Sequence, residues 1–517
     1  MNYFKFTFLF SLIIYSFLPA QTSPAIQWQK SLGGSQGEHA KSVQQTSDGG
    51  YIVAGLSNST DGDVTGNHGG SDYWIVKLDA SGTIQWQKSL GGSSNDNANF
   101  IQQTSDGGYI IAGESNSNDG DVTGNHGNFD YWIVKLDASG TLQWQKSLGG
   151  SNQDVANCIR QTTDGGYIVA GESYSTNGDV TGNHGISDYW IVKLDASGTM
   201  QWQKSLGGTS YEGANSIQQT SDGGYILAGT GSSTNGDISI NYGNGDFWIV
   251  KLDASGMIQW EKSLMGNLAD TAQSIQQTSD GGYIVAGMSN STNSEIPLMF
   301  GTSNYCVAKL DSNGNTLWQR YFGGSGEDHP YSTQQTSDGG YIVAGATGSL
   351  DGHITGNHGS FDFWIVKLDD TGNIQWQKPL GGSDFDEAYS IQQTADSGYI
   401  IAGMIFSADG NITGYHGNND AWIVKLSSTQ LNTGETQLIN KPIIYPNPAK
   451  DMIHLDHLPA ETVVHITDMS GRNRFTQKYK EKKINIPVSQ FNNSVYLIQV
   501  QHQGKIILSD KLIIRKQ

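Results

Sequence analysis

Residues 86–143 read WQKSLGGSSNDNANFIQQTSDGGYIIAGESNSNDGDVTGNHGNFDYWIVKLDASGTLQ, and this 58-residue unit recurs along most of the chain. A fixed period of this length is typical of a repeat protein, in which each unit buries its apolar faces against its neighbours. The chain holds seven copies of the unit, whose first tryptophan returns every 58 residues, at Trp28, Trp86, Trp144, Trp202, Trp260, Trp318 and Trp376.

Each copy contains four short segments with strand character. In the first copy they are residues 42–46, 51–55, 73–78 and 84–90. Segment 51–55 (YIVAG) is apolar throughout, as expected of a strand covered on both faces, whereas segment 84–90 (IQWQKSL) alternates like a half-exposed edge strand. The links SDGG and DASG consist of residues that favour tight hairpins. Each copy is therefore predicted to be a four-stranded antiparallel meander.

Seven such meanders predict an all-β fold, a seven-bladed β-propeller. An open β-solenoid and another all-β arrangement are the alternatives. Residues 26–32 match the fourth segment but precede the first full copy, and the seventh copy ends after its third segment at residues 421–426. We expect the N-terminal strand to complete the last blade and close the ring, because closure removes open sheet edges.

The composition limits the classes of partner. There are 67 glycines but 10 prolines, which fits a turn-rich β protein. The net charge of −20, from 29 basic and 49 acidic residues, repels nucleic acid and anionic lipid surfaces. Cys158 and Cys306 stand in different repeats, so we expect two buried thiols and no disulfide between them.

The two ends of the chain do not follow the repeat. Residues 1–20 carry a lysine, an apolar run and a small-residue end, which is the pattern of a secretory signal peptide. We expect a propeller at 21–426, a polar linker at 427–441 and a second domain at 442–517. That domain has alternating segments that predict a small immunoglobulin-like β-sandwich. Its strands are expected at residues 452–455, 463–467, 484–487, 495–500 and 506–514.

The last domain opens on Tyr445-Pro446-Asn447-Pro448 followed by AKD, carries DMSGR around Gly471, and ends on KL and RK. This pattern resembles the C-terminal sorting domain of type IX secretion in Bacteroidota, although Ser494 stands where that family usually has glycine. The resemblance implies export across the outer membrane by the type IX secretion machinery, followed by release or attachment at the cell surface. The repeats are similar to uncharacterised propeller-type repeats of secreted proteins from the same bacteria.

One acidic residue occupies the same position after the fourth segment in every copy. Such a ring could bind a cation or accept hydrogen bonds from sugar hydroxyls near the central opening. The alternative is a carboxylate that caps backbone N–H groups at the start of the inner strand. The seven residues are Glu38, Asp96, Asp154, Glu212, Asp270, Asp328 and Asp386.

The loop between the second and third segments is rich in aspartate, asparagine and glycine, which is the chemistry of calcium loops. Asx-turns that satisfy the loop's own backbone are the alternative. The calcium candidates in the first two copies are Asp61, Asp63, Asp72, Asp119, Asp121 and Asp130. One histidine per blade recurs in this loop but cannot converge on a single zinc ion; these residues are His68, His126, His184, His358 and His416.

All thirteen tryptophans occupy two repeat positions, and we expect them to pack between blades, with sugar stacking as the alternative. The tryptophans of the third segment are Trp74, Trp132, Trp190, Trp248, Trp364 and Trp422.

Seven equivalent carboxylates do not provide an acid and a base in different environments, which argues against catalysis. The loop at residues 294–306 departs most from the repeat. If one unique site exists, we expect it there; the alternative is a blade whose sequence has drifted without gaining a function.

We therefore expect a secreted or cell-surface, non-enzymatic adhesion protein that is a monomer and binds glycan or protein through its loops. Seven similar weak sites could act together on a polymer. A polysaccharide hydrolase or lyase and a purely structural surface protein are the alternatives. No cofactor is required by the sequence, although calcium fits the loops.

Overall fold

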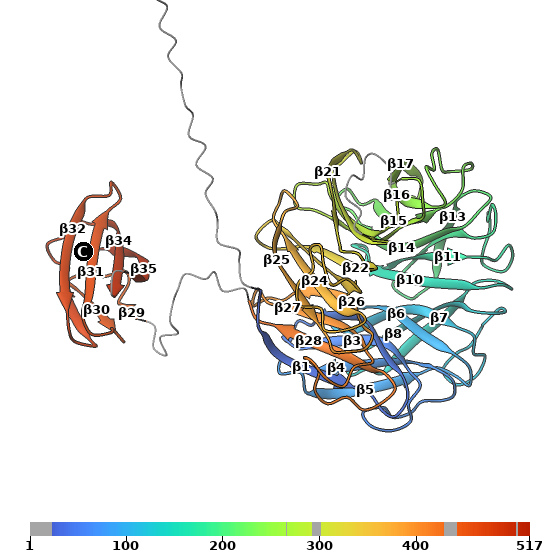
Figure 1. Ribbon diagram of the computed structural model, residues 1–517, viewed down its shortest axis with the longest axis horizontal. Helices are drawn as coiled ribbons and strands as arrows, with labels where there is room; N and C mark the ends of the chain where they lie inside the picture. Colours follow the sequence, from blue (N-terminus) through green and yellow to red (C-terminus); the bar gives the residue numbers. More distant parts are fainter. Residues whose placement is uncertain (1–22, 265, 292–300, 429–441, 503–504, 517) are drawn as a thin grey trace, which may run out of the picture. The chain divides into compact units, whose positions relative to one another are not determined.

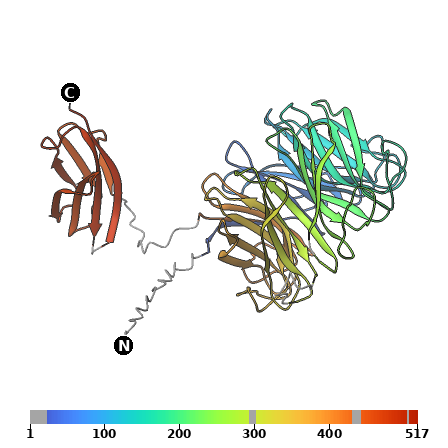
Figure 2. The same ribbon diagram turned by 90° about the horizontal axis from the view of Figure 1, so that it is seen from above.

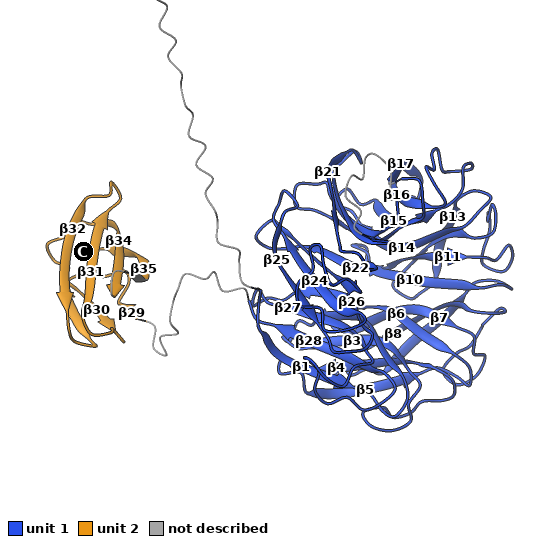
Figure 3. Ribbon diagram, in the orientation of Figure 1, with its two compact units in different colours: residues 1–430 blue, residues 431–517 orange. Residues whose placement is uncertain are grey.

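The computed structural model describes residues 23–264, 266–291, 301–428, 442–502 and 505–516. The expected signal peptide and most of the expected linker lie outside these residues, as does most of the divergent loop of the fifth repeat. The chain divides into two compact units, Met1–Gln430 and Leu431–Gln517 (Figure 3). All regular elements of the described residues are strands (Figures 1 and 2).

Unit 1 is a seven-bladed β-propeller, as predicted, and each blade is a four-stranded antiparallel sheet. Blades one to three comprise β2–β5 (Glu38–Gln45, Tyr51–Ser57, Asp72–Leu78, Ile84–Leu90), β6–β9 (Asp96–Gln103, Tyr109–Ser115, Asp130–Leu136, Leu142–Leu148) and β10–β13 (Asp154–Gln161, Tyr167–Ser173, Asp188–Leu194, Met200–Leu206). Blades four to six comprise β14–β17 (Glu212–Gln219, Tyr225–Gly231, Asp246–Leu252, Ile258–Leu264), β18–β21 (Asp270–Gln277, Tyr283–Ser289, Asn304–Leu310, Thr316–Phe322) and β22–β25 (Asp328–Gln335, Tyr341–Thr347, Asp362–Leu368, Ile374–Leu380).

Blade seven closes the ring. It comprises β26 (Asp386–Gln393), β27 (Tyr399–Ile405), β28 (Asp420–Leu426) and, from the other end of the unit, β1 (Ile26–Leu32). β1 pairs antiparallel with β28, with Ile26 opposite Leu426 and Leu32 opposite Ala421. In Figure 1 the blue β1 lies beside the orange β28. The predicted closure by the N-terminal strand is confirmed.

The middle strands form the core between blades. Every residue of β4 is buried, whereas β5 alternates between exposed and partly buried positions at its start, as the sequence pattern predicts. Trp74 is buried on β4, and its Nε1 donates to Gln87 Oε1 at 2.9 Å. Trp86 packs edge-on against Tyr109 of the next blade, with ring centroids 5.8 Å apart. The tryptophans therefore pack within and between blades.

A lysine buried on the third strand of each blade is anchored to the first hairpin. Lys77 Nζ lies 2.9 Å from Asp48 Oδ2 and donates to the Leu78 carbonyl oxygen at 3.1 Å. Burial alone would raise the pKa of Asp48, but hydrogen bonds from Thr46 and Lys77 lower it to about 2. The other six blades repeat this pair at Lys135–Asp106, Lys193–Asp164, Lys251–Asp222, Lys309–Asp280, Lys367–Asp338 and Lys425–Asp396.

Unit 2 is a small β domain with two sheets. One sheet has the order β29–β30–β33 and the other β32–β31–β34–β35. Their bounds are Ile443–Tyr445, Met452–Asp456, Thr462–Asp468, Asn473–Tyr479, Ile484–Pro487, Ser494–His502 and Lys505–Ile514 for β29 to β35. Ile453, Val464 and Ile498 lie in the core of this unit and are fully buried.

The opening motif of unit 2 is held to its last strand. Asn447 Nδ2 donates to the Lys511 carbonyl oxygen at 2.6 Å, and Asn447 Oδ1 accepts from Ile513 N at 2.9 Å. Gly471 has φ +81° in the turn after β31, a conformation that glycine adopts without strain. These contacts give Asn447 and Gly471 structural roles within the domain.

The sequence predictions for strands needed three corrections. The inner strand of the first blade starts at Glu38 rather than residue 42, because Glu38 is buried and its N–H donates to the Asn419 carbonyl oxygen of blade seven. β29 was missed because it has 3 residues, and β32 because its residues are largely exposed and polar. Cys158 and Cys306 are buried in blades three and five, and no disulfide joins them.

Closure by β1 gives the first prediction. A variant that lacks residues 1–32 leaves β28 with an unpaired edge and removes the buried side chain of Leu32. We expect the midpoint of thermal unfolding to fall by about 10 °C or more, and we expect association through the exposed edge. A variant that lacks only residues 1–22 is the control, because it keeps β1. Equal unfolding midpoints and elution volumes for the two variants would refute the role of β1.

Candidate functional site

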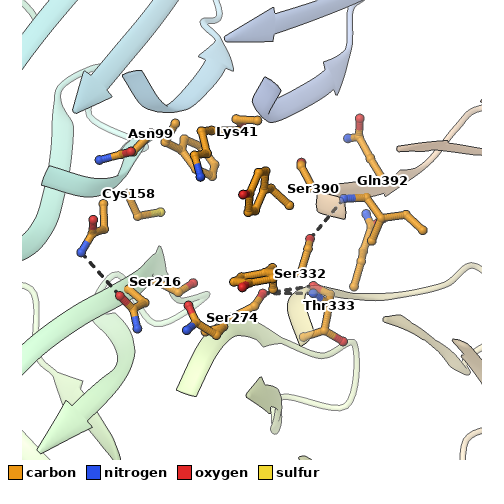
Figure 4. A pocket seen from close by; sticks show the side chains of 18 of the residues that line it. Lys41, Asn99, Cys158, Ser216, Ser274, Ser332, Thr333, Ser390 and Gln392 are labelled. Atoms are coloured by element: carbon orange, nitrogen blue, oxygen red, sulfur yellow. Dashed lines mark hydrogen bonds between the residues drawn. The ribbon is translucent and has the colours of Figure 1, made fainter. Parts of the chain in front are cut away.

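The seven innermost strands surround a central cavity of about 350 Å³. They are β2, β6, β10, β14, β18, β22 and β26, one from each blade. Figure 4 shows Lys41, Asn99, Cys158 and Ser216 from successive strands around this cavity. The volume lies within the range of small-molecule pockets, about 300–1,000 Å³.

The side chains that line the cavity differ from blade to blade. All seven inner strands have glutamine at the position of Gln103, whose Oε1 accepts a hydrogen bond from Ser47 N at 2.8 Å across the blade interface. Four residues earlier along each strand the repeat is not kept, and the side chains there line the cavity: Lys41, Asn99, Asn157, Asn215, Gln273, Tyr331 and Tyr389. The cavity is therefore asymmetric although the scaffold is regular.

One sector of the cavity wall forms a polar cluster across blades six, seven and one. The Tyr389 hydroxyl donates to Glu387 Oε2 at 2.7 Å, and the Tyr331 hydroxyl donates to Glu387 Oε1 at 2.5 Å. Lys41 Nζ lies 3.5 Å from the centroid of the Tyr389 ring, a cation–π contact. Glu387 is 6% exposed. We name these four residues the channel cluster.

Burial perturbs two basic groups at this sector. It lowers the pKa of Lys41 to about 8, and the nearby Glu387 carboxylate opposes that shift only in part. Burial, followed by the charge of Lys41, lowers the pKa of His39 to about 4. Side chains in a cavity whose pKa values are shifted from the ordinary ones mark a candidate functional site. Sequence reasoning missed this site because it gave weight to positions that recur; the variation at the lining positions was the available indication.

The seven recurrent carboxylates are fully buried rather than presented to the opening. Asp96 Oδ2 accepts from Gly92 N at 2.7 Å and from Ser117 Oγ at 2.9 Å. Each of the other six also accepts the N–H of the glycine four residues earlier. These contacts favour the capping role. Ligand binding by the seven carboxylates stays a prediction.

The structure brings two sets of predicted residues together in pairs. A Cβ placed on Gly91 would lie 2.5 Å from Asp96 Oδ2 and 2.9 Å from Asp72 Oδ1, so both carboxylates crowd the same glycine. Asp72 Oδ2 accepts from His68 Nδ1 at 2.7 Å, whereas Asp72 Oδ1 has no hydrogen-bond donor among the described residues. Burial raises the pKa of both Asp72 and Asp96. Asp72 and Asp96 therefore hold a proton more readily than aspartates in water do.

The calcium candidates do not converge on one point. Asp61 Oδ1 accepts from Ser35 N at 2.7 Å, and Asp63 Oδ2 accepts from Gly33 N at 3.2 Å. In blade two, Asp119 and Asp121 bind the corresponding N–H groups, while Asp130 binds His126. Among the described residues, no group of three or more acidic, histidine or cysteine side chains is placed to hold a metal ion. Calcium binding by these loops stays a prediction.

The five recurrent histidines lie apart, each on its own blade. His68, His126, His184, His358 and His416 each place Nδ1 2.6–2.9 Å from the buried aspartate four residues later. Each histidine therefore helps to hold its own loop.

The fold and the last domain define the class of protein. Residues 443–515 match the family described as the secretion system C-terminal sorting domain, and these residues form most of unit 2. The chain is thus a propeller protein of the type IX secretion route, which directs export to the cell surface or the surroundings in Bacteroidota. No helix among the described residues is long and apolar enough to cross a membrane.

Residues 187–477, more than half of the chain, match the family described as outer membrane protein assembly factor BamB. The chain belongs to this family. The matched segment runs from blade three through blade seven and ends inside unit 2.

Comparison with individual proteins shows more distant similarity. The chain is 24% identical over 417 residues to the regulatory protein FlaEY of Caulobacter vibrioides, covering 69% of this chain and 41% of that protein. The chain thus spans less than half the length of that curated relative.

Solved structures show low similarity to the chain. The WD40 domain of Neurospora crassa Pan2 has 10% identity and a TM-score of 0.43, covering 80% of this chain and 99% of that domain. PorZ, described as a surface component of the type IX secretion system of Porphyromonas gingivalis, has 12% identity and a TM-score of 0.25, covering 96% of this chain and 87% of that chain. An extracellular domain of a hybrid two-component system from B. thetaiotaomicron has 11% identity and a TM-score of 0.43, covering 96% of this chain and 59% of that chain.

The buried carboxylate pairs give the second prediction. Burial raises the pKa of Asp130 from 3.8 to about 6, although His126 opposes the shift. The folded state therefore binds the proton more tightly, and this contribution to stability is lost as the pH rises from 3.8 to about 6. We expect Asp130→Asn to raise the free energy of unfolding near neutral pH by up to about 3 kcal/mol and to have little effect near pH 4.

Asp106→Asn is the matched control. Hydrogen bonds from Thr104 and Lys135 outweigh burial and lower the pKa of Asp106 to about 2, so its contribution is present above 3.8 and is lost as the pH falls towards 2. This substitution should destabilise the protein near neutral pH. Thermal unfolding across the pH range measures both effects. Parallel curves for Asp130→Asn and the unsubstituted protein would contradict the raised pKa.

Proposed function

We propose that this exported propeller is a non-enzymatic binding protein of the cell surface or the surroundings, with an adhesive role. In this proposal the loop-rich mouth and the central cavity recognise a glycan or a protein. The observation that carries the proposal is the contrast between the regular scaffold and the irregular cavity lining. Residues that build blades recur, whereas Lys41, Gln273 and Tyr389 occupy one repeat position and differ.

The geometry of the mouth supports the same proposal. The loop from β5 to β6 and the loop from β7 to β8 lie at the same end, because Ser93 N donates to Asp119 Oδ1 at 2.7 Å. Loops on a rigid scaffold commonly carry binding function. The net charge of −20 disfavours nucleic acid as the partner. In each blade only the innermost and the outermost strand are sheet edges, and we propose a monomer.

A polysaccharide-degrading enzyme is the second candidate, and one observation favours it. Lys41, with its pKa lowered to about 8, lies in a cavity beside two tyrosines, as a proton-transferring group could. Asp328 and Asp386, two of the seven recurrent carboxylates, are fully buried and accept hydrogen bonds from glycine N–H groups. Lys41 therefore replaces them as the residue to test.

A polysaccharide array gives the third prediction. We expect the full chain to bind saturably to a polysaccharide among microbial and plant samples, and we expect Lys41→Met to weaken that binding about tenfold without any product being formed in either case. Asn215→Ala, at the same repeat position in blade four, is the control and should change affinity less.

Repeating the array with calcium and then with a chelator tests the aspartate loops. Loss of binding in chelator would support calcium sites in those loops. Release of shortened saccharide that Lys41→Met abolishes would establish the enzyme instead. Absence of binding to every polysaccharide would remove the glycan form of the proposal and leave a protein partner or structural display.

A further inference from the structure

Three phenylalanines form an aromatic ledge at the mouth of blades six and seven. The centroids of Phe361 and Phe385 are 5.0 Å apart, and those of Phe385 and Phe406 are 6.1 Å apart. Phe406 is 37% exposed, and the other two rings are half-buried. His329 extends the ledge, with its ring centroid 5.9 Å from that of Phe361. We name Phe361, Phe385 and Phe406 the phenylalanine ledge.

The ledge continues into the channel cluster along two inner strands. Phe385 lies next to the first residue of β26, and Glu387 and Tyr389 follow at every second position. On β22, His329 contacts the ledge through Phe361, and Tyr331 two residues later binds Glu387. A path of aromatic rings, hydroxyls and one carboxylate therefore runs from the mouth to the cavity.

Blades three and four carry a different combination at the corresponding place. Tyr174 and Tyr211 form an aromatic pair there, with centroids 6.4 Å apart, and Tyr211 is 51% exposed. The residue two positions after Tyr211 is Gly213, where blade seven has Glu387. The acidic group beside that pair, Glu172, belongs to β11 and not to the inner strand: a Cβ placed on Gly213 would lie 2.9 Å from Glu172 Oε2.

The chemistry along the path matches a carbohydrate. A sugar ring presents C–H groups on its faces, which pack on aromatic rings, and hydroxyls at its edge, which pair with carboxylates, amides and tyrosine hydroxyls. Asn99 and Asn157 bring amide groups to the cavity wall, where the Nδ2 of each also donates to a backbone carbonyl oxygen of the next blade. The cavity lining is rich in hydroxyl and amide side chains, whereas apolar peptide anchors require apolar pockets.

Charge narrows the class of carbohydrate. The chain carries 49 acidic against 29 basic residues, which repels an anionic polymer. Two cations line the cavity: Lys41 faces the Tyr389 ring and Arg160 faces the Phe100 ring, and burial lowers the pKa of Lys41 to about 8. A neutral saccharide avoids the repulsion and can still use every donor and acceptor of the path.

We propose that the phenylalanine ledge stacks against the rings of a neutral polysaccharide and that the end of the polymer enters the cavity beside Tyr331, Glu387 and Tyr389. This inference rests on the proposed binding function and assigns it a ligand class and a place. It also makes the binding site single, located at blades six, seven and one.

The test measures affinities of the full chain for neutral hexasaccharides of glucose, mannose, galactose and N-acetylglucosamine by calorimetry. For a hexasaccharide that binds, Phe385→Ala and Phe406→Ala are each expected to weaken binding about tenfold. Tyr211→Ala, the matched aromatic control, is expected to change affinity less than about twofold. Phe406 is partly exposed, so its variant tests the ledge with less risk to folding than Phe385, and thermal unfolding verifies both.

Glu387→Gln separates the cavity from the ledge. It keeps the shape of the side chain but removes the charged acceptor of both tyrosine hydroxyls. We expect weaker binding of the hexasaccharide and a smaller loss for a disaccharide that reaches only the ledge.

The outcomes distinguish this inference from the proposed function. Equal losses in Phe406→Ala and Tyr211→Ala, or none in either, would overturn the site while binding itself stands. Saturable binding only to anionic polysaccharides or to a protein would overturn the neutral ligand class and leave the proposed function intact. Absence of binding to any polysaccharide or protein sample would overturn both.

Discussion

The antiparallel pairing of β1 with β28 is the constraint on which the propeller depends. Those two strands are at opposite ends of the unit in sequence, and their hydrogen bonds join the first and last repeats. Without that pairing, blade seven would have three strands and an open edge. Since each blade packs against two neighbours only when the ring is closed, the central cavity also depends on this contact.

A closed ring of equal blades separates two kinds of residue. Residues that hold one blade to the next must recur, as Lys77 with Asp48 and Gln103 with the backbone of Ser47 do. Side chains that face the axis also contact the next blade, as Asn99 does when its Nδ2 donates to the Ala156 carbonyl oxygen, but these contacts differ from blade to blade, so blade building restricts their identity less. Lys41, Tyr331 and Tyr389 of the channel cluster occupy positions of this second kind, and their divergence is a stronger indication of binding than the recurrence of any carboxylate.

The sequence predicted the fold well because periodicity and turn chemistry are local features. The interval between Trp28 and Trp86 predicted the length of one blade. The position of segment 26–32 before the first full copy predicted how the ring closes. The site was harder to predict, because Tyr331, Glu387 and Lys41 come from three blades and converge only in the closed ring. Burial was equally invisible: Asp96 reads as a mouth residue in sequence, yet the β5–β6 loop folds over it and donates Gly92 N to its carboxylate.

The same reasoning changes the expected mode of binding. Seven weak equivalent sites at the mouth require an equivalent accessible group there in every blade, and the acidic residue that recurs after the fourth strand is fully buried. The accessible groups at the axis differ: blade four offers Asn215 where blade seven offers Tyr389. Avidity from identical blades is therefore a poor description of this molecule. A regular ring that supports one irregular sector can instead orient a single polymer end, because rigid neighbouring blades fix the positions of its aromatic and polar groups.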